Sequence, residues 1–213
     1  MSGMPRVHAG VLRLVAVTDS LSGGIDGLAH RATAAVAGGA TMLTLRLPDE
    51  SPRTLAEIAR ALRAAAPHVP LLVSDHVDVA LAVDADGAHV GANDLPASAV
   101  RRFAPDRFII GASIGAMDEV SRAEGADFVA IGAVFAASAS GGEHSMMGVA
   151  RFSDLARACG LPAIAVGGIT PQNAGALMAA GAAGVAVISA LFGADDPESA
   201  ARALRAAVDA SGT

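Results

Sequence analysis

Several polar side chains follow short apolar segments, which is where a folded chain can present them to a ligand. Arg46 follows one such segment, Asp75 follows a second, and Asp94 lies three residues after Gly91 at the end of a third. Ser113 ends a further segment. Two carboxylates can share a Mg²⁺ ion with phosphate oxygens, and arginine can bind a phosphate through two hydrogen bonds. These residue types predict a site for a phosphorylated ligand.

Three of these residues also have a simpler interpretation. Asp75 could accept hydrogen bonds as the N-cap of a helix. Asp94 could belong to a surface turn, and Arg46 could form an ion pair with Asp75 or Asp94. The sequence leaves both interpretations open.

A second candidate site comes from glycines near the C-terminus. Gly167 and Gly168 follow an apolar segment, and Ser189 follows the next one. Backbone N–H groups in such loops can approach an anion closely. The pattern predicts a phosphate site, although the two glycines could also serve only a tight turn.

The residues that are missing exclude some kinds of catalysis. The chain has fifteen basic residues and all are arginine, so a lysine Schiff base is excluded. One cysteine, Cys159, excludes an intrachain disulfide and a multi-thiolate metal site. Among the six histidines, His89 is expected to be packed or hydrogen-bonded, and His144 lies in a loop from which it could reach a ligand.

The chain repeats one pattern from end to end, in which short β-branched apolar runs alternate with alanine-rich helical stretches. Continuous apolar runs of this kind predict strands of a parallel sheet that is buried on both faces. The expected strands are residues 12–17, 42–47, 69–74, 87–90, 108–113, 128–131, 162–166 and 184–188. The expected helices include residues 25–37, 52–65, 118–124, 149–158, 171–179 and 197–208.

Eight such units in 213 residues fit an α/β fold of the (β/α)8 TIM-barrel type, with a doubly wound open sheet as the alternative. No linker divides the chain, so residues 1–213 are expected to form a single domain, with residues 1–10 as a poorly ordered N-terminal tail. In such a barrel the loops after the strands form the working face. All the candidate residues above would therefore lie at one end of the barrel.

Composition excludes several classes of partner. The formal net charge of −6 disfavours a nucleic-acid binder, which needs a basic surface. With 53% hydrophobic and 17% charged residues, the chain can bury a large core and is not expected to be disordered. No apolar run is long enough to span a membrane, and no signal peptide is recognised, so a cytoplasmic location is expected.

Long segments of the chain resemble thiamine-phosphate synthases, in the same order. They read LLVSDHVDVALAVDADGAHVGANDLP at residues 71–96, then FIIGASIGAMDEV, GADFVAIGAVF and PAIAVGGITPQNAGALMAAGAAGVAVISALF. The resemblance extends from about residue 12 to the C-terminus. The chain is therefore identified as a member of the superfamily that joins these synthases to the TenI-type thiazole tautomerases, all of them small (β/α)8 barrels.

The resemblance implies an activity in thiamine biosynthesis. Such a synthase joins hydroxymethylpyrimidine diphosphate to thiazole phosphate and releases pyrophosphate, with the thiazole nitrogen capturing a pyrimidine carbocation. The resemblance assigns Mg²⁺ to Asp75 and Asp94. It names Arg46 and Ser113 as the catalytic residues, with Arg46 binding the pyrophosphate and Ser113 facing the pyrophosphate or the pyrimidine. It assigns the thiazole phosphate to Gly167, Gly168, Ile188 and Ser189.

The chain also departs from the family pattern. The family segment Gln-x-Arg-Glu-Lys reads Thr44-Leu45-Arg46-Leu47-Pro48 here, so one glutamine and one lysine are absent. Ser74 and Ala92 replace an asparagine and a glutamine. Ser138 and Ser140 lie in a loop that carries Thr-x-Thr-Lys in the family, so a second lysine is missing. Ser74, Ser138 and Ser140 remain expected substrate-binding residues.

Two other functions stay open at this stage. A TenI-type tautomerase would use a histidine two residues after the strand serine, but Gly115 stands there, so His144 or His89 would have to act instead. A barrel that binds a phosphorylated ligand without catalysis is the other alternative. An alanine-rich outer helix could also form the contact of a homodimer.

Overall fold

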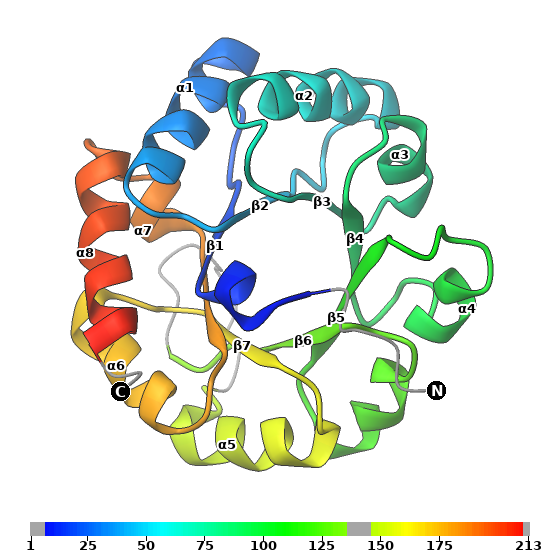
Figure 1. Cartoon of the computed structure of the whole chain (residues 1–213), viewed down its shortest axis with the longest axis vertical. Helices are drawn as coiled ribbons and strands as arrows, with labels where there is room; N and C mark the ends of the chain where they lie inside the picture. Colours follow the sequence, from blue (N-terminus) through cyan, green and yellow to red (C-terminus); the bar gives the residue numbers. More distant parts are fainter. Residues whose placement is uncertain (1–6, 136–145, 211–213) are drawn as a thin grey trace.

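The computed structural model describes residues 7–135 and 146–210, and it shows a closed barrel of parallel strands surrounded by helices (Figure 1). Each strand pairs with the next along the chain, and β8 pairs with β1. The strands are β1 Leu14–Val17, β2 Met42–Leu45, β3 Leu71–Ser74, β4 Gly87–Val90, β5 Ile109–Ile114, β6 Phe128–Ile131, β7 Ala163–Val166 and β8 Gly184–Val187. The prediction of a (β/α)8 barrel is confirmed, and the open-sheet alternative is wrong.

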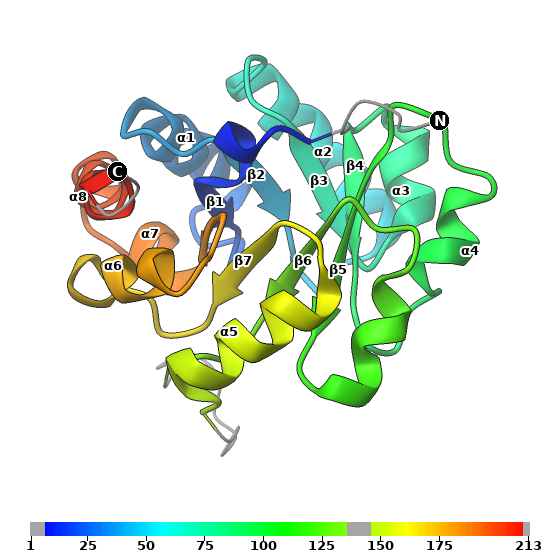
Figure 2. The same ribbon diagram turned by 60° about the horizontal axis from the view of Figure 1, so that its bottom comes forward.

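Helices follow the strands and cover the barrel. Figures 1 and 2 show α8 beside α1, which closes the helical layer where the last unit meets the first. The helices are α1 Gly24–Ala37, α2 Pro52–Ala65, α3 Val77–Ala82, α4 Ala97–Arg101, α5 Gly148–Cys159, α6 Pro171–Ala179, α7 Ser189–Phe192 and α8 Pro197–Ala210, with 3-10 helices η1 Ala9–Leu12 and η2 Met117–Ala123.

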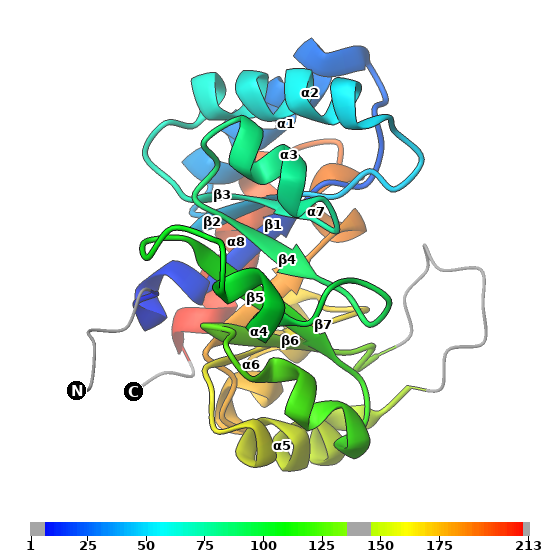
Figure 3. The same cartoon turned by 90° about the vertical axis from the view of Figure 1, so that its right-hand side faces the viewer.

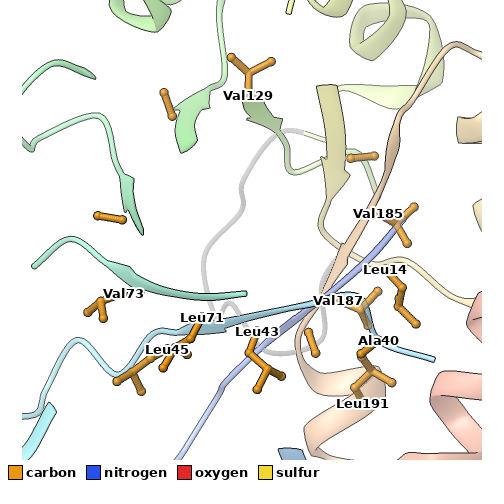
Figure 4. Packing of buried hydrophobic residues seen from close by; sticks show 14 of the residues in the cluster. Leu14, Ala40, Leu43, Leu45, Leu71, Val73, Val129, Val185, Val187 and Leu191 are labelled. Carbon is orange, nitrogen blue, oxygen red and sulfur yellow. The ribbon is translucent and has the colours of Figure 1, made fainter. Parts of the chain in front are cut away.

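Alternate side chains of each strand face two different cores. Leu14, Leu43 and Leu45 belong to the larger core between the strands and the helices (Figure 4). Val15, Val17 and Met42 belong to the core inside the barrel. Successive strand residues point to opposite faces of the sheet, so each strand is apolar on both faces, as its sequence predicts.

The start of the chain differs from the prediction. Val7, which belongs to the expected tail of residues 1–10, is buried in the inner core together with Leu12. Part of this segment therefore packs against the end of the barrel from which the strands start. Figure 3 shows η1, in blue, at the end from which the strands start. The first strand begins at Leu14 rather than at residue 12, because Leu12 is apolar as the last residue of η1 and not as part of the sheet.

Three further differences concern the elements near the working face. The segment expected as a helix at residues 118–124 is the 3-10 helix η2, and the short helices α3, α4 and α7 were not predicted. The second strand ends at Leu45 instead of residue 47. The amide of the next residue, Arg46, is bound by the hydroxyl of Thr18 at 2.8 Å and does not continue the strand ladder.

No helix in the described part of the chain is long and apolar enough to cross a membrane.

Candidate functional site

A pocket of about 250 Å³ opens at the end of the barrel where the strands finish. Its wall is divided by chemistry. Strands β2 to β5 and the residues that follow them supply polar groups, which are Thr44, Arg46, Ser74, Asp75, His89 and Ser113. Strands β1 and β6 to β8 supply apolar groups, which are Val15, Val17, Phe128, Ala130, Ile164, Val166, Ala186 and Ile188. We call these two halves the polar wall and the apolar wall.

The structure brings Asp75 and Asp94 together beside Gly91, although they follow different strands. A Cβ atom added to Gly91 would lie 3.3 Å from Asp94 Oδ2 and 3.7 Å from Asp75 Oδ1. The backbone of Asp75 adopts a positive φ of 69°. Its N–H donates to the carbonyl of His89 at 2.8 Å, so the neighbouring strand holds this uncommon conformation in place.

Hydrogen bonds orient both carboxylates. Ser74 Oγ donates to Asp75 Oδ1 at 2.9 Å, and the N–H of Gly91 donates to Asp94 Oδ2 at 2.7 Å. Asp94 thus closes the turn of residues 91–94 with its side chain, and the same carboxylate lies beside that of Asp75. Asp75 is not the N-cap of α3, because that position belongs to His76.

The pKa of Asp75 is raised above its usual value. The largest cause is partial burial, which disfavours the charged form. The hydrogen bond from Ser74 opposes the rise, the negative charge of Asp94 adds to it, and the charge of Arg46 opposes it. A carboxylate that is partly buried beside another negative charge would be stabilised by a cation between the two.

This pair fits a Mg²⁺ ion by the nature of its donors. Mg²⁺ is commonly held by one or two carboxylates, with substrate phosphates and water completing the shell. No group of three or more His, Cys, Asp or Glu side chains with metal-binding geometry occurs in the described residues. Asp75 and Asp94 would therefore hold the ion only together with a ligand that brings oxygens of its own.

Arg46 is exposed at the rim of the polar wall. Within residues 7–135 and 146–210 its guanidinium forms no ion pair with Asp75 or Asp94, although its charge opposes the rise in the pKa of Asp75. The alternative in which Arg46 serves an internal ion pair is thus not what the structure shows. Its guanidinium remains available to an anionic ligand in the pocket.

Ser113 and His89 form a hydrogen-bonded pair within the polar wall. His89 Nε2 lies 2.9 Å from Ser113 Oγ, and the imidazole packs against the ring of Phe128 with centroids 6.0 Å apart. Burial is the main cause that lowers the pKa of His89 to about 4, so the imidazole is neutral at pH 7. The expectation that His89 is packed or hydrogen-bonded is confirmed, because the imidazole is both.

Replacing Gly111 with alanine is expected to disturb this pair and destabilise the barrel. The new Cβ would lie 2.4 Å from Phe128 Cζ and 2.5 Å from His89 Nδ1, which forces both rings to move. Overpacking of this kind costs about 1–3 kcal/mol of unfolding free energy. Chemical denaturation measures the loss. The control is Gly10→Ala, whose added Cβ meets no atom within 4 Å; equal stability of the two variants would contradict the prediction.

The glycine loop after β7 lies beside the apolar wall. Gly167 has a positive φ of 97°, and a Cβ there would lie 2.8 Å from the Cβ of Ala133, so this position requires glycine for structural reasons alone. Asn173 shapes the loop, because its amide donates to the carbonyl of Gly168 at 2.9 Å and accepts from the N–H of Thr170 at 2.8 Å.

The four expected phosphate-binding residues lie close together at the ends of adjacent strands. Val166 of β7 pairs with Ala186 of β8, and Gly167, Gly168, Ile188 and Ser189 follow directly. Of these residues only Ile188 lines the pocket itself. Phosphate binding by this group stays a prediction.

Ser138, Ser140 and His144 fall outside the described residues. The two ends of their segment are placed, because the N–H of Phe135 donates to Gly167 O at 3.2 Å and the N–H of Met147 donates to Ala133 O at 3.1 Å. The described residues on either side of this segment, Phe135 and Met147, therefore lie near the glycine loop.

The sequence interpretation missed two polar side chains of the site. Thr44 lines the pocket and is 6% exposed, and Thr18 is 1% exposed behind Arg46. A signal for Thr44 was present, because residues two apart in a strand share a face and Arg46 was already a candidate. The role of Thr18 depends on how β1 and β2 pair, which the sequence does not reveal.

Thiamine-phosphate synthases are among the known proteins to which this chain is similar. The family model described as thiamine monophosphate synthase matches residues 14–191. The chain is 42% identical to the thiamine-phosphate synthase of Roseiflexus castenholzii, covering 88% of this chain and 84% of that protein. It is 41% identical to that of Moorella thermoacetica, covering 91% and 94%.

A solved structure with a similar fold also comes from a protein of this kind. The thiamine phosphate pyrophosphorylase of Pyrococcus furiosus superposes with a TM-score of 0.84 at 34% identity, covering 95% of this chain and 98% of that one. A 3-hexulose-6-phosphate synthase superposes with a TM-score of 0.74 at 19% identity, which shows a shared fold alone.

Proposed function

The chain belongs to the thiamine monophosphate synthase family, and from this premise we propose that it joins hydroxymethylpyrimidine diphosphate to thiazole phosphate with release of pyrophosphate. The observation that carries the proposal is the polar wall. It places Asp75 and Arg46 in the lining of one pocket, with the carboxylate of Asp94 beside Asp75, and the guanidinium of Arg46 forms no ion pair among the described residues. That combination suits a diphosphate bound together with a divalent cation. The diphosphate is the leaving group of the pyrimidine precursor.

In the proposed reaction the polar wall acts on the leaving group. Asp75 and Asp94 would hold Mg²⁺, which supplies positive charge to the departing pyrophosphate. Arg46 would bind the same phosphates, and Ser113, oriented by His89, would contact the pyrimidine or its diphosphate. As the carbon–oxygen bond breaks, its electrons leave with pyrophosphate, and the thiazole nitrogen then forms the new bond to the pyrimidine methylene carbon.

The apolar wall would align the second substrate. Val166 and Ile188 lie where an aromatic thiazole could pack, next to the glycine loop proposed to bind its phosphate. The two substrates would thus enter from opposite walls and meet over the pocket. Holding two reactants in this way removes much of the entropic barrier of a bimolecular step.

Arg46 would supply a larger share of the positive charge at the pyrophosphate here than in the family pattern. It is the one cationic side chain that lines the pocket within residues 7–135 and 146–210. The two family lysines are absent from the sequence. We therefore propose that Arg46 and Mg²⁺ together supply the positive charge that the pyrophosphate requires.

The tautomerase alternative has less support, because Gly115 occupies the position of the histidine that it needs. In the structure the N–H of Gly115 donates to Glu119 Oε2 at 2.6 Å, so this carboxylate is occupied by the backbone. His89 is the one histidine among the described residues that line the pocket, and it is hydrogen-bonded to Ser113.

A turnover assay with both precursors and Mg²⁺ tests the proposal. The expected result is thiamine phosphate, detected by fluorescence after oxidation, together with an equal amount of pyrophosphate. Conversion of a thiazole tautomer without pyrophosphate release would favour the tautomerase, and binding of thiazole phosphate without turnover would favour a binding protein.

Removal of the metal is expected to stop turnover. Because Asp75 and Asp94 offer only carboxylate oxygens, EDTA should abolish thiamine phosphate formation and added Mg²⁺ should restore it. The check is to follow product formation during a Mg²⁺ titration of EDTA-treated protein. Full activity in the presence of EDTA would contradict this prediction.

Three expectations from the sequence remain proposals. They are that residues 1–213 form one domain, that the protein is cytoplasmic, and that it forms a homodimer.

A further inference from the structure

A single buried hydroxyl binds both backbone polar groups of Arg46. Thr18 follows β1 and is 1% exposed. Its Oγ1 accepts a hydrogen bond from the N–H of Arg46 at 2.8 Å and donates to the carbonyl oxygen of Arg46 at 3.0 Å. The N–H of Thr18 donates to Thr44 O at 3.0 Å, which ties the same segment to β2. We call this arrangement the Thr18 clasp.

The clasp holds the backbone from which the side chain of Arg46 extends. Arg46 is the first residue after β2, so the strand ladder no longer fixes its backbone. Its guanidinium has no ion pair or hydrogen bond among the residues that the structure describes, so no contact at the far end of the side chain fixes it either. The direction in which the guanidinium enters the pocket therefore depends on the backbone that Thr18 holds.

The same strand pair contains a second clasp at its opposite end. Thr41 Oγ1 accepts from the N–H of Leu14 at 3.0 Å and donates to the carbonyl of Leu14 at 3.1 Å. This clasp joins β1 and β2 with the same pair of bonds, but it lies at the start of the strands, away from the pocket. Thr41 thus offers a matched reference for what a clasp contributes to stability alone.

We propose that Thr18 is a positioning residue that sets Arg46 for the diphosphate of the substrate. The proposal rests on the proposed function for the identity of that diphosphate. It requires that losing the Thr18 hydroxyl weakens binding at the polar wall specifically, whereas losing the Thr41 hydroxyl affects only stability.

The test compares Thr18→Val with Thr41→Val, since each change removes one hydroxyl and keeps a branched side chain. Isothermal titration calorimetry with pyrophosphate and Mg²⁺ gives a binding constant that does not depend on turnover. Steady-state kinetics then gives KM separately for the two precursors. Thr18→Ser, which keeps the hydroxyl, serves as the rescue variant.

For Thr18→Val we expect about tenfold weaker pyrophosphate binding and about a tenfold higher KM for the diphosphate precursor, because a lost hydrogen bond to a positioned group has about this effect. The KM for thiazole phosphate should change less than twofold, and Thr18→Ser should restore pyrophosphate binding. Thr41→Val should bind pyrophosphate as the unmodified protein does, even where its melting temperature falls equally.

Equal pyrophosphate binding by Thr18→Val and Thr41→Val would overturn the proposal, as would no pyrophosphate binding by the unmodified protein. If Thr18→Val does not fold, Thr18→Cys takes its place, because its thiol is a weak donor. Pyrophosphate binding that depends on Thr18, without formation of thiamine phosphate, would support the clasp and contradict the proposed function, so the two failures are distinguishable.

Discussion

Replacing Asp75 or Asp94 with asparagine is expected to lower the rate of thiamine phosphate formation by about a hundredfold or more. Each change removes one of the two charges that would hold Mg²⁺, whose charge stabilisation of a departing phosphate amounts to several kcal/mol. The fold should tolerate both changes, because asparagine keeps the shape and retains an acceptor for Ser74 or for the N–H of Gly91. Turnover under saturating Mg²⁺ and both precursors measures the effect.

Asp78→Asn is the matched control for these variants. Asp78 lies three residues from Asp75, its side chain is 77% exposed, and it does not line the pocket of the polar wall, although it borders a neighbouring pocket together with Asp75 and Asp94. This variant should keep its activity within about twofold, as expected for a solvated surface charge. If Asp75→Asn and Asp94→Asn retained the activity of Asp78→Asn, the proposed metal site would be wrong.

Replacing Arg46 with glutamine is expected to have the second largest effect, a fall of about 10- to 100-fold in kcat/KM for the diphosphate precursor. A charge-assisted hydrogen bond contributes about 1.5–3 kcal/mol, and no second cation in the described part of the pocket can compensate. The change should act on the diphosphate precursor rather than on thiazole phosphate. Steady-state kinetics with one precursor varied at a time separates the two.

Arg53→Gln provides the comparison for Arg46. Arg53 is an exposed arginine in α2, and it does not line the pocket. Its loss changes the net charge by the same amount without touching the polar wall. Similar losses in both variants would mean that overall charge, and not the position of Arg46, determines binding of the diphosphate.

The fold was predictable because a parallel barrel repeats one local pattern. Apolar runs such as residues 128–131 are buried on both faces, and the strand there has the predicted bounds. Strand ends were less predictable, since an apolar residue such as Leu12 is equally buried beneath the barrel. The four-residue helix α7 gives no periodic signal, because it is barely one turn long.

The site was predictable where a residue follows a strand. Asp75, Asp94 and Arg46 were proposed because the ends of neighbouring strands meet at one face, and the structure brings Asp75 and Asp94 together beside Gly91. Thr18 was not predictable, because its role arises from hydrogen bonds between residues 28 apart in the sequence. The sequence left the purpose of Gly167 open, and the contact with Ala133 now supplies a structural reason for it.

Locating the metal ion tests the proposed site of Asp75 and Asp94 directly. Crystals grown with Mn²⁺ in place of Mg²⁺ and with pyrophosphate would reveal the ion by anomalous scattering. We expect one anomalous peak between the carboxylates of Asp75 and Asp94, with the pyrophosphate bridging from that ion to the guanidinium of Arg46. A peak elsewhere in the barrel, or pyrophosphate bound only at the glycine loop, would contradict the assignment of the leaving group to the polar wall.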